Sequence, residues 1–387
     1  MRHPRPIFSF LIFLTLLGNA AAQTQKGFLG RTLDKFTSTS RELDPDAVYQ
    51  PAPRWTFALT GDLRQAEVSQ KQEFALPYAI LGPDDEMIIS WTPIYLSSIL
   101  KGKTNKAIGL QAGYGNLSIA LSKTFRAEGT ERVFSFDYLS AGHAVQVQFF
   151  NLSNPVNYHM TYSQEDDWAY REEEGITENP GNMRALIVDA IYAFNRRSFA
   201  YSAAYKGNLF QKHSAGSWMF GSKLILGEYS IDPSEEMSGW TGGQARQTSA
   251  QLSFGGGYSY NLVPYHRQPY AERDKGLRNV TINLTFIPMV TLFNQFTSTT
   301  YQQNDDSNLF EEVDKSVMNG KLLINYVARF GISYSVNLFT FNLSASKDDF
   351  SYKGTSGLTF EGYKSNDVKT SGNFSRWMIA FRLGKRF

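Results

Sequence analysis

Few residues of this sequence have the types and spacing that a catalytic or metal site requires. The histidines that follow the N-terminal segment are His143, His159, His213 and His266, and none of them forms a closely spaced metal-binding pair. His213 and Ser214 are adjacent, and a histidine beside a serine is the pairing that a lipase or acyltransferase uses. Neighbours on a strand point to opposite faces, so we interpret this pair as part of a polar connection with Gly216 as its turn former.

Two acidic stretches contain the oxygen ligands that calcium prefers. One combines residues 165–167 with 172–174, and the other combines residues 304–308 with Glu311 and Glu312. Neither stretch has the strict spacing of a calcium loop, and both are typical of solvated loops. The glycines at 255–257 lie within a strand pattern without a following lysine or helix, which indicates close packing or curvature. The sequence therefore predicts no metal and no cofactor.

The stretch from Arg376 to Phe387 shows the pattern that the rest of the chain repeats. Its apolar residues share one face and are Trp377, Ile379, Phe381, Leu383 and Phe387. Arg382, Gly384 and Arg386 lie on the other face, so the period is that of a β-strand with one apolar side. An exposed apolar edge strand favours aggregation, whereas a closed membrane barrel needs such a strand to complete its ring.

The same alternation recurs along the chain. Its clear segments are 55–60, 108–114, 117–125, 134–138, 145–149, 186–194, 199–205, 218–226, 251–262, 280–291, 324–333, 339–345 and 376–387. Residues 65–105 are ambiguous and have room for one or two more strands. Gly115-Asn116 between two segments predicts a hairpin turn. These segments number thirteen, and because single-chain bacterial barrels have even strand counts, we expect one to be missed or split.

The polar face of these strands favours a barrel over a soluble sandwich. It is built mostly of Ser, Thr, Gln, Asn and Gly, whereas bulk water would attract Lys and Glu. The opposite face is apolar and rich in aromatic side chains, as lipid and its interfaces require. We therefore predict an all-β fold, a closed antiparallel transmembrane β-barrel of about 12 strands, with 14 as the next choice and 10 to 14 as the range.

Charged residues on the polar face are the candidates for the lumen. They are Asp137, Asp189, Lys223, Arg329, Arg382 and Arg386. Opposite charges inside a narrow barrel pair across the lumen and brace it, although a selectivity constriction uses the same residue types. We favour bracing, since side chains and inward loops can largely fill a barrel of this size.

The N-terminus predicts export. Arg2 and Arg5 precede a short apolar run, and Ala20-Ala21-Ala22 offers a cleavage site, so residues 1–22 are interpreted as a secretory signal peptide. Residues 23–54 form a lead-in and residues 55–387 the barrel. Arg2 and Arg5 account for the whole formal charge of +2, so the remaining chain has no net charge and no signal for nucleic acid. There is no cysteine. We expect the outer membrane of a Gram-negative cell.

Two resemblances add to these expectations. The last strand resembles the C-terminal signal by which outer-membrane barrels reach their assembly machinery, although Lys385 stands where an apolar residue is usual. The sequence also resembles a Bacteroidota outer-membrane family catalogued as a domain of unknown function (number 4421). The resemblance lies in the runs Tyr192–Asn195, Phe199–Tyr205, Ser214–Trp218 and Gly257–Leu262, and in the hairpin from Ile108 to Leu121. This resemblance implies a single barrel domain and no catalytic residue. The expected partners are outer-membrane lipid, lipopolysaccharide and the barrel-assembly machinery.

Connection lengths suggest an orientation, and the absence of a catalytic constellation suggests a function. Connections at 230–249, 294–317 and 351–373 are long and those at 206–215 and 331–335 are shorter, so the C-terminus is expected in the periplasm, with 263–278 as an exception. We expect a non-enzymatic structural or binding barrel. The alternative is a narrow channel whose water path is lined by Gln146, Gln148, Ser253, Asn283 and Asn325. A lipid-active enzyme is the third hypothesis.

Overall fold

The structure is a computed structural model, and its compact unit spans Leu43–Phe387. It describes residues 43–51, 55–81, 87–101, 105–125, 130–163, 170–177, 179–231, 244–270, 274–303, 310–319, 323–360 and 363–387. The predicted signal peptide at 1–22 and the first part of the predicted lead-in lie outside the described residues. The same holds for residues 165–167 of the first predicted acidic stretch and for residues 304–308 of the second.

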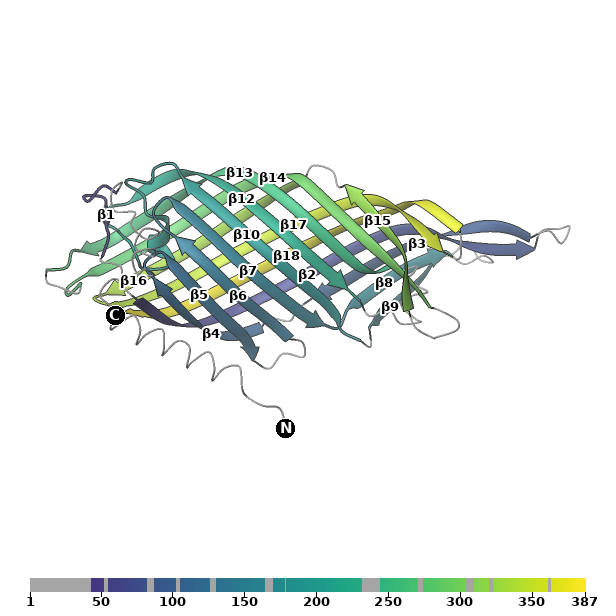
Figure 1. The fold of residues 1–387 in the computed structure, drawn as a ribbon, viewed down its shortest axis with the longest axis horizontal. Coiled ribbons are helices and arrows are strands. Elements are labelled where there is room, and N and C mark those ends of the chain that lie inside the picture. Colours follow the sequence, from purple (N-terminus) through teal and green to yellow (C-terminus); the bar gives the residue numbers. More distant parts are fainter. Residues whose placement is uncertain are drawn as a thin grey trace, which may run out of the picture. The chain divides into compact units, whose positions relative to one another are not determined.

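Twelve strands pair in one antiparallel ring (Figure 1). They are β2 (Trp55–Leu81), β4 (Asn105–Tyr114), β5 (Leu117–Phe125), β6 (Thr130–Leu139), β7 (His143–Asn154), β10 (Gly181–Ala193), β12 (Ala215–Ser230), β13 (Gln244–Arg267), β14 (Arg278–Gln303), β16 (Leu323–Val336), β17 (Phe339–Phe360) and β18 (Tyr363–Arg386). Each pairs with the next, and β18 also pairs with β2, which closes the ring. The predicted all-β closed antiparallel barrel of 12 strands is confirmed.

The remaining strands are not part of this ring. β3 (Met87–Lys101) pairs with β2, and the two form a hairpin at the end of the barrel opposite to the C-terminus (Figure 1). β8 (Asn157–Ser163) and β9 (Tyr170–Ile176) continue from β3, and β15 (Phe310–Asn319) pairs with β14. β1 (Val48–Tyr49) pairs with β11 (Phe210–Gln211). We call the end that carries the C-terminus the C-terminal end, and the other the distal end. No helix among the described residues is long and apolar enough to cross a membrane.

The predicted hairpin and the apolar face are both present in the structure. Tyr114 pairs with Leu117 across a turn at Gly115, whose φ of 54° favours glycine. Ile108, Leu110, Ile119 and Leu121 all point away from the lumen, with 44–50 % of each side chain exposed. Exposed aromatic side chains concentrate near the C-terminal end, as the boundary of a membrane requires, and include Phe57, Phe194, Trp218, Tyr258, Tyr260, Tyr334, Phe339, Phe341 and Phe387.

One predicted strand is wrong. Residues 199–205 do not cross the barrel but form an inward loop with the 3₁₀-helix η1 (Tyr201–Ala204). The alternation of aromatic and small residues there was read as two faces. In the structure Phe199, Ala200, Tyr201 and Ser202 are all buried, because the segment is surrounded by the barrel wall. Removing this segment from the thirteen predicted strands leaves the twelve of the ring.

Several predicted connections are also wrong. Residues 331–335 lie within β16, and the turn follows at Asn337, whose positive φ of 53° closes the hairpin with β17. The long connections predicted at 294–317 and 351–373 are largely strand, since β14, β15, β17 and β18 continue to pair beyond the apolar belt. Their polar side chains alternate without an apolar face, so the pattern resembled that of loops although the backbone ladder continues.

The glycines at 255–257 lie where the backbone of β14 comes close to that of β13. A Cβ atom on Gly255 would lie 2.0 Å from the Pro288 carbonyl oxygen, and one on Gly257 would lie 2.1 Å from the Phe286 carbonyl oxygen. The register between β13 and β14 shifts near Leu252, beside the glycines. The predicted close packing is therefore observed, and the glycines let two strongly curved strands approach each other.

Candidate functional site

The lumen of the barrel is the candidate site, and its C-terminal end is filled by the connection between β10 and β12. We call residues 194–214 the plug segment. The side chains of Phe199 and Tyr201 pack with inward residues of the wall such as Ile287 and Val327. The described part of the lead-in adds to this filling, since Val48 and Tyr49 pair with Phe210–Gln211 of the plug segment. The chain thus places two separate segments at one mouth of its own barrel.

Two arginines of the last strand bind the backbone of the plug segment. Arg382 donates from Nη1 to the Lys206 carbonyl oxygen at 2.8 Å and to Asn342 Oδ1 at 3.0 Å. Arg386 donates from Nη1 to the Gly207 carbonyl oxygen at 3.5 Å and from Nη2 to the Asn337 carbonyl oxygen at 2.7 Å, and its guanidinium lies 4.8 Å from the ring centre of Phe210. Arg386 also pairs with Asp274 at 3.3 Å. Both arginines follow the inward parity of β18, so strand alternation aims them at the plug segment.

Inward amides of the wall hold the plug segment by further hydrogen bonds. Asn261 Nδ2 donates to the Ala200 carbonyl oxygen at 2.8 Å, and Asn342 Nδ2 donates to the Ala204 carbonyl oxygen at 3.2 Å. Tyr205 donates from its hydroxyl to Asn283 Oδ1 at 2.6 Å. A loop buried inside a barrel must have its backbone polar groups satisfied, and short amide side chains on the wall do this.

Lys206 is a buried charged residue of the plug segment. Among the described residues of that segment, it is the one whose buried charged group has no hydrogen-bond partner. It is 4 % exposed, and its Nζ atom is not hydrogen-bonded. It lies in a connection rather than in a spanning strand. Burial lowers the pKa of Lys206 to about 7, Asp137 opposes this shift, and Arg382 adds to it. A cavity of about 190 Å³ is lined both by Lys206 and by Asp189, Arg329 and Asp348 in the middle of the lumen.

The middle of the lumen is crossed by a chain of ion pairs. Lys223 Nζ lies 3.0 Å from Asp189 Oδ1 and 2.8 Å from Asp348 Oδ1. Arg329 lies 2.9 Å from Asp189 Oδ2 and donates to the Tyr201 hydroxyl at 3.2 Å. Asp189 and Lys223 are neighbours on β10 and β12, whereas Arg329 and Asp348 come from β16 and β17. The network therefore connects opposite walls of the barrel.

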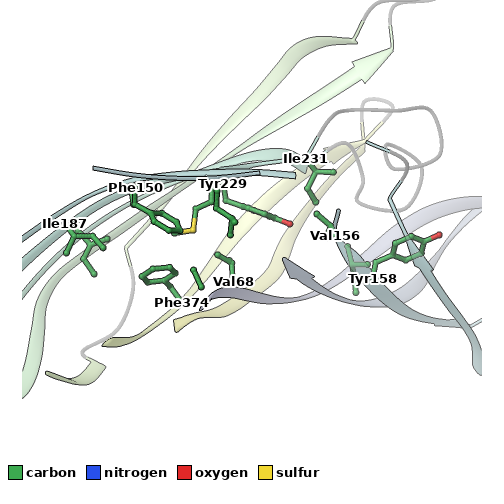
Figure 2. Packing of buried hydrophobic residues seen from close by; sticks show 14 of the residues in the cluster. Val68, Phe150, Val156, Tyr158, Ile187, Tyr229, Ile231 and Phe374 are labelled. Carbon is green, nitrogen blue, oxygen red and sulfur yellow. The ribbon is translucent and has the colours of Figure 1, made fainter. Parts of the chain in front are cut away.

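The distal part of the lumen is filled by apolar side chains, most of them from strands of the wall and others from β3 and β8 (Figure 2). Phe150 and Phe374 meet with their ring centres 6.2 Å apart, and Val68, Ile187 and Tyr229 surround them. We call this group the distal cluster; its members are Ala66, Val68, Phe74, Ile94, Leu96, Val133, Phe150, Leu152, Val156, Tyr158, Met183, Ala185, Ile187, Ile225, Tyr229, Ile231 and Phe374. The prediction of an inward face built mostly of Ser, Thr, Gln, Asn and Gly therefore does not hold in this distal part of the lumen.

The six predicted lumen residues all lie inside the barrel, and their surroundings differ. Asp189, Lys223 and Arg329 belong to the ion-pair network, and Arg382 and Arg386 bind the plug segment. Asp137 accepts a hydrogen bond from Gln146 Nε2 at 3.1 Å and borders the cavity. Five of them are less than 9 % exposed, and the side chain of Arg329 is 11 % exposed.

Sequence reasoning missed other buried charges of the lumen. Arg64 is 1 % exposed and pairs with Glu131 at 2.9 Å, and Arg376 donates to Gln148 Oε1 at 2.7 Å. Arg376 already lies on the inward parity of the predicted strand 376–387, and extending the predicted strand 55–60 to Arg64 would have placed that residue inward too. Lys206 had no such signal, because residues 206–215 are predicted as a connection, where strand parity does not apply.

The residues predicted as an assembly signal lie on the outward face of β18. Ile379, Phe381 and Phe387 are 42 %, 48 % and 61 % exposed, and Trp377 and Leu383 follow the same parity. Lys385, the departure from the usual pattern, also points outward. Its ammonium lies 4.8 Å from the ring centre of Phe387 and 5.5 Å from that of Phe339, which are cation–π distances.

The residues considered for catalysis or metal binding do not converge. His213 and Ser214 are exposed, and Ser214 Oγ accepts a hydrogen bond from the Val263 backbone N–H at 2.9 Å. The described residues contain no group of three or more His, Cys, Asp or Glu side chains that could hold a metal ion. His159 instead contacts the nearby Glu174 at 2.9 Å on the surface.

Comparison with known proteins places the sequence in a family. The family model described as "Domain of unknown function (DUF4421)" matches residues 95–370. The chain belongs to this family. The match confirms the predicted family resemblance. A search of curated proteins found no match.

Solved structures of other barrels show weak similarity to this family member. The outer membrane protease OmpT from Escherichia coli shares 7% sequence identity, covers 86% of this chain and 97% of its own, and has a TM-score of 0.40. The P. putida toluene transporter TodX and a Pseudomonas aeruginosa FadL homologue share 6% and 9%, with TM-scores of 0.18 and 0.20. Each covers 86% of this chain and 90% of its own. These likenesses are too weak to support a conclusion about this chain.

Proposed function

We propose that this protein is a filled, non-conducting outer-membrane barrel that acts as a structural or binding protein without catalysis. The observation that carries the proposal is that the lumen is occupied at three successive levels. These are the plug segment, the ion-pair network from Asp189 to Asp348, and the distal cluster. Strand closure and the outward apolar belt support a membrane location.

The short turns support the orientation with the C-terminal end in the periplasm. The turns at Gly115 and Asn337 lie at that end, whereas the strands that continue far beyond the belt lie at the distal end. Outer-membrane barrels combine short periplasmic turns with longer extracellular parts. The distal end would then face the outside of the cell.

The geometry does not favour the alternative channel. Asn283, Asn325 and Ser253 are at most 2 % exposed, and they bond to wall neighbours rather than line an open path. Asn325 Nδ2 donates to Thr291 Oγ1 at 2.6 Å. Gln148 accepts from Arg376, and Gln146 donates to Asp137. Side chains with such partners have little capacity left for a permeating solute.

Conductance of the purified, folded protein in planar bilayers tests the proposal. The intact chain should be silent. Replacing residues 198–210 by a Gly-Ser linker should leave it silent, because the distal cluster remains, and Phe150→Ser with Phe374→Ser should do the same. Combining both changes with Lys223→Ser, which also breaks the ion-pair network, should give steady conductance. Steady conductance of the intact chain would contradict the proposal and make the protein a pore.

The lipid-enzyme hypothesis has a separate test. His213→Ala and Ser214→Ala should leave the lipid profile of the outer membrane unchanged. A changed profile in both variants, with normal amounts of folded barrel, would instead support catalysis at this pair.

A further inference from the structure

The outward face of the barrel carries a hollow of about 690 Å³ near its distal rim. It extends across β5, β6, β7, β10, β12, β13 and β14. Outward side chains line it in two rows. The row nearer the C-terminal end consists of Leu121, Phe134, Phe149, Leu186, Leu226 and Ala250. The row nearer the rim consists of Arg132, Asn151, Arg184, Glu228, Thr248 and Thr297.

Strand register shows that each row is continuous. In the apolar row, Leu186 is opposite both Phe149 and Leu226, and Leu226 is opposite Ala250. In the polar row, Arg184 is opposite both Asn151 and Glu228. The two rows are separated by one step of two residues along every strand. The hollow therefore lies where the apolar belt ends and the polar rim begins.

The polar row has an excess of positive charge. Arg132 is opposite Asn151 on one side and Lys123 on the other. Glu228, the one carboxylate of the row, is paired with Arg246 at 3.0 Å. Arg132 and Arg184 are exposed, and within the described part of the chain neither forms an ion pair with a carboxylate. Strand spacing places these two arginines about 10 Å apart.

We propose that this hollow binds a phosphorylated, multiply acylated lipid of the outer leaflet, of the lipid A type. The inference rests on the proposed function, because it needs the distal rim to face the outside of the cell. Acyl chains would lie along the apolar row, and phosphate groups would accept hydrogen bonds from Arg132 and Arg184. Arginine binds phosphate with a planar pair of donors, which gives both affinity and orientation.

The size of the surface favours this lipid over a two-chain phospholipid. The six strands that carry the apolar row lie about 4.8 Å apart, so the row is about 24 Å wide, which is wide enough for several chains side by side. Two separated arginines also suit a headgroup with more than one phosphate.

Native mass spectrometry of the folded, full-length barrel in detergent tests the proposal. Diphosphorylated lipid A, the same lipid after removal of its phosphates, and phosphatidylglycerol would be titrated separately. We expect lipid A to bind at least tenfold more tightly than either of the others. Equal binding of the dephosphorylated lipid, or of phosphatidylglycerol, would overturn the proposal.

Paired variants locate the site. Arg132→Glu with Arg184→Glu should reduce lipid A binding at least tenfold. The matched control, Lys71→Glu with Lys347→Glu, makes the same charge change at exposed outward positions elsewhere and should leave binding unchanged. Ala250→Trp fills the apolar row while keeping both arginines and should also weaken binding. Equal binding by the arginine variant and its control would overturn the proposal.

These outcomes are separate from those that test the proposed function. A conducting barrel that still binds lipid A through Arg132 and Arg184 would contradict the filled lumen but not the lipid site. A non-conducting barrel that shows no preference for lipid A would contradict the lipid site but not the filled lumen. Loss of the folded band on unheated gels identifies a variant that fails to fold, and Ala250→Trp then provides the independent test.

Discussion

The two ends of the lumen are filled in different ways. At the C-terminal end a separate piece of chain occupies the mouth, and its backbone is held by directed bonds from Arg382, Asn261 and Asn342. At the distal end the wall fills itself with its own apolar side chains, such as Phe150 and Phe374. Directed bonds require particular residues, whereas apolar filling requires mainly volume. The two ends should therefore respond differently to substitutions of similar size.

Arg382→Met should give the largest effect, a loss of about 3 kcal/mol or more. It leaves the Lys206 carbonyl, Asn342 Oδ1 and Gln111 Oε1 without their shared donor in a buried place. The temperature at which the folded gel band disappears measures the loss. Lys385→Met on the outward face of the same strand is the control and should lose less than about 1 kcal/mol. Equal losses would show that the plug segment does not depend on Arg382.

Lys206 gives the polar end a pH dependence that the apolar end lacks. Its folded pKa of about 7 lies below the ordinary lysine value of 10.5, so between these pH values the unfolded chain binds more protons. Folded stability should therefore rise from about pH 7 to about pH 9, by on the order of 2 kcal/mol. The same gel assay at both pH values measures the rise.

Lys206→Met should be less dependent on pH over that window and more stable at its lower end, because no buried ammonium remains. Lys212→Met changes a half-buried lysine of the same plug segment and should keep the wild-type rise. An unchanged rise in Lys206→Met would assign the pH dependence to another group.

The smallest effect is expected at the apolar end. Phe374→Leu should cost about 1 kcal/mol, since neighbouring side chains of the distal cluster adjust to a modest loss of volume. Asn342→Leu changes the size of a side chain at the polar end only slightly. It should cost about 2 kcal/mol, because the Ala204 carbonyl oxygen and Arg382 each lose a hydrogen bond to Asn342. A larger loss for Phe374→Leu than for Asn342→Leu would reverse the comparison.

Most of the ring was predictable because strand parity is a strong signal on a wall that separates lipid from lumen. The apolar outward face made segments such as 251–262 and 280–291 evident, and the even count of barrels pointed to 12 strands. Beyond the belt this contrast disappears. Strands such as β17 and β18 there carry polar residues on both faces, so their continued pairing depends on backbone bonds to neighbours that local sequence does not reveal.

The filling of the lumen was only half predictable. Parity placed Asp189, Lys223 and Arg329 inside, but their mutual contacts depend on which strands face one another across the ring. The plug segment escaped because Phe199, Tyr201 and Ala203 alternate with small residues that tolerate burial. In a strand of the wall, Ala200 and Ser202 would face the lumen and the aromatic side chains would face lipid. In the structure both groups of side chains are instead buried against protein.

Closure of the ring has a consequence for how the chain folds. Trp377 Nε1 donates to Gln65 Oε1 across the β18–β2 seam, and the two residues are 312 positions apart in sequence. Contacts of such separation form slowly, because the chain must be nearly complete before they can form. Until then β2 and β18 both present unpaired apolar edges, which are the surfaces most prone to misassociation. Pairing of β18 with β2 is therefore the folding step that a factor assisting membrane insertion would accelerate most.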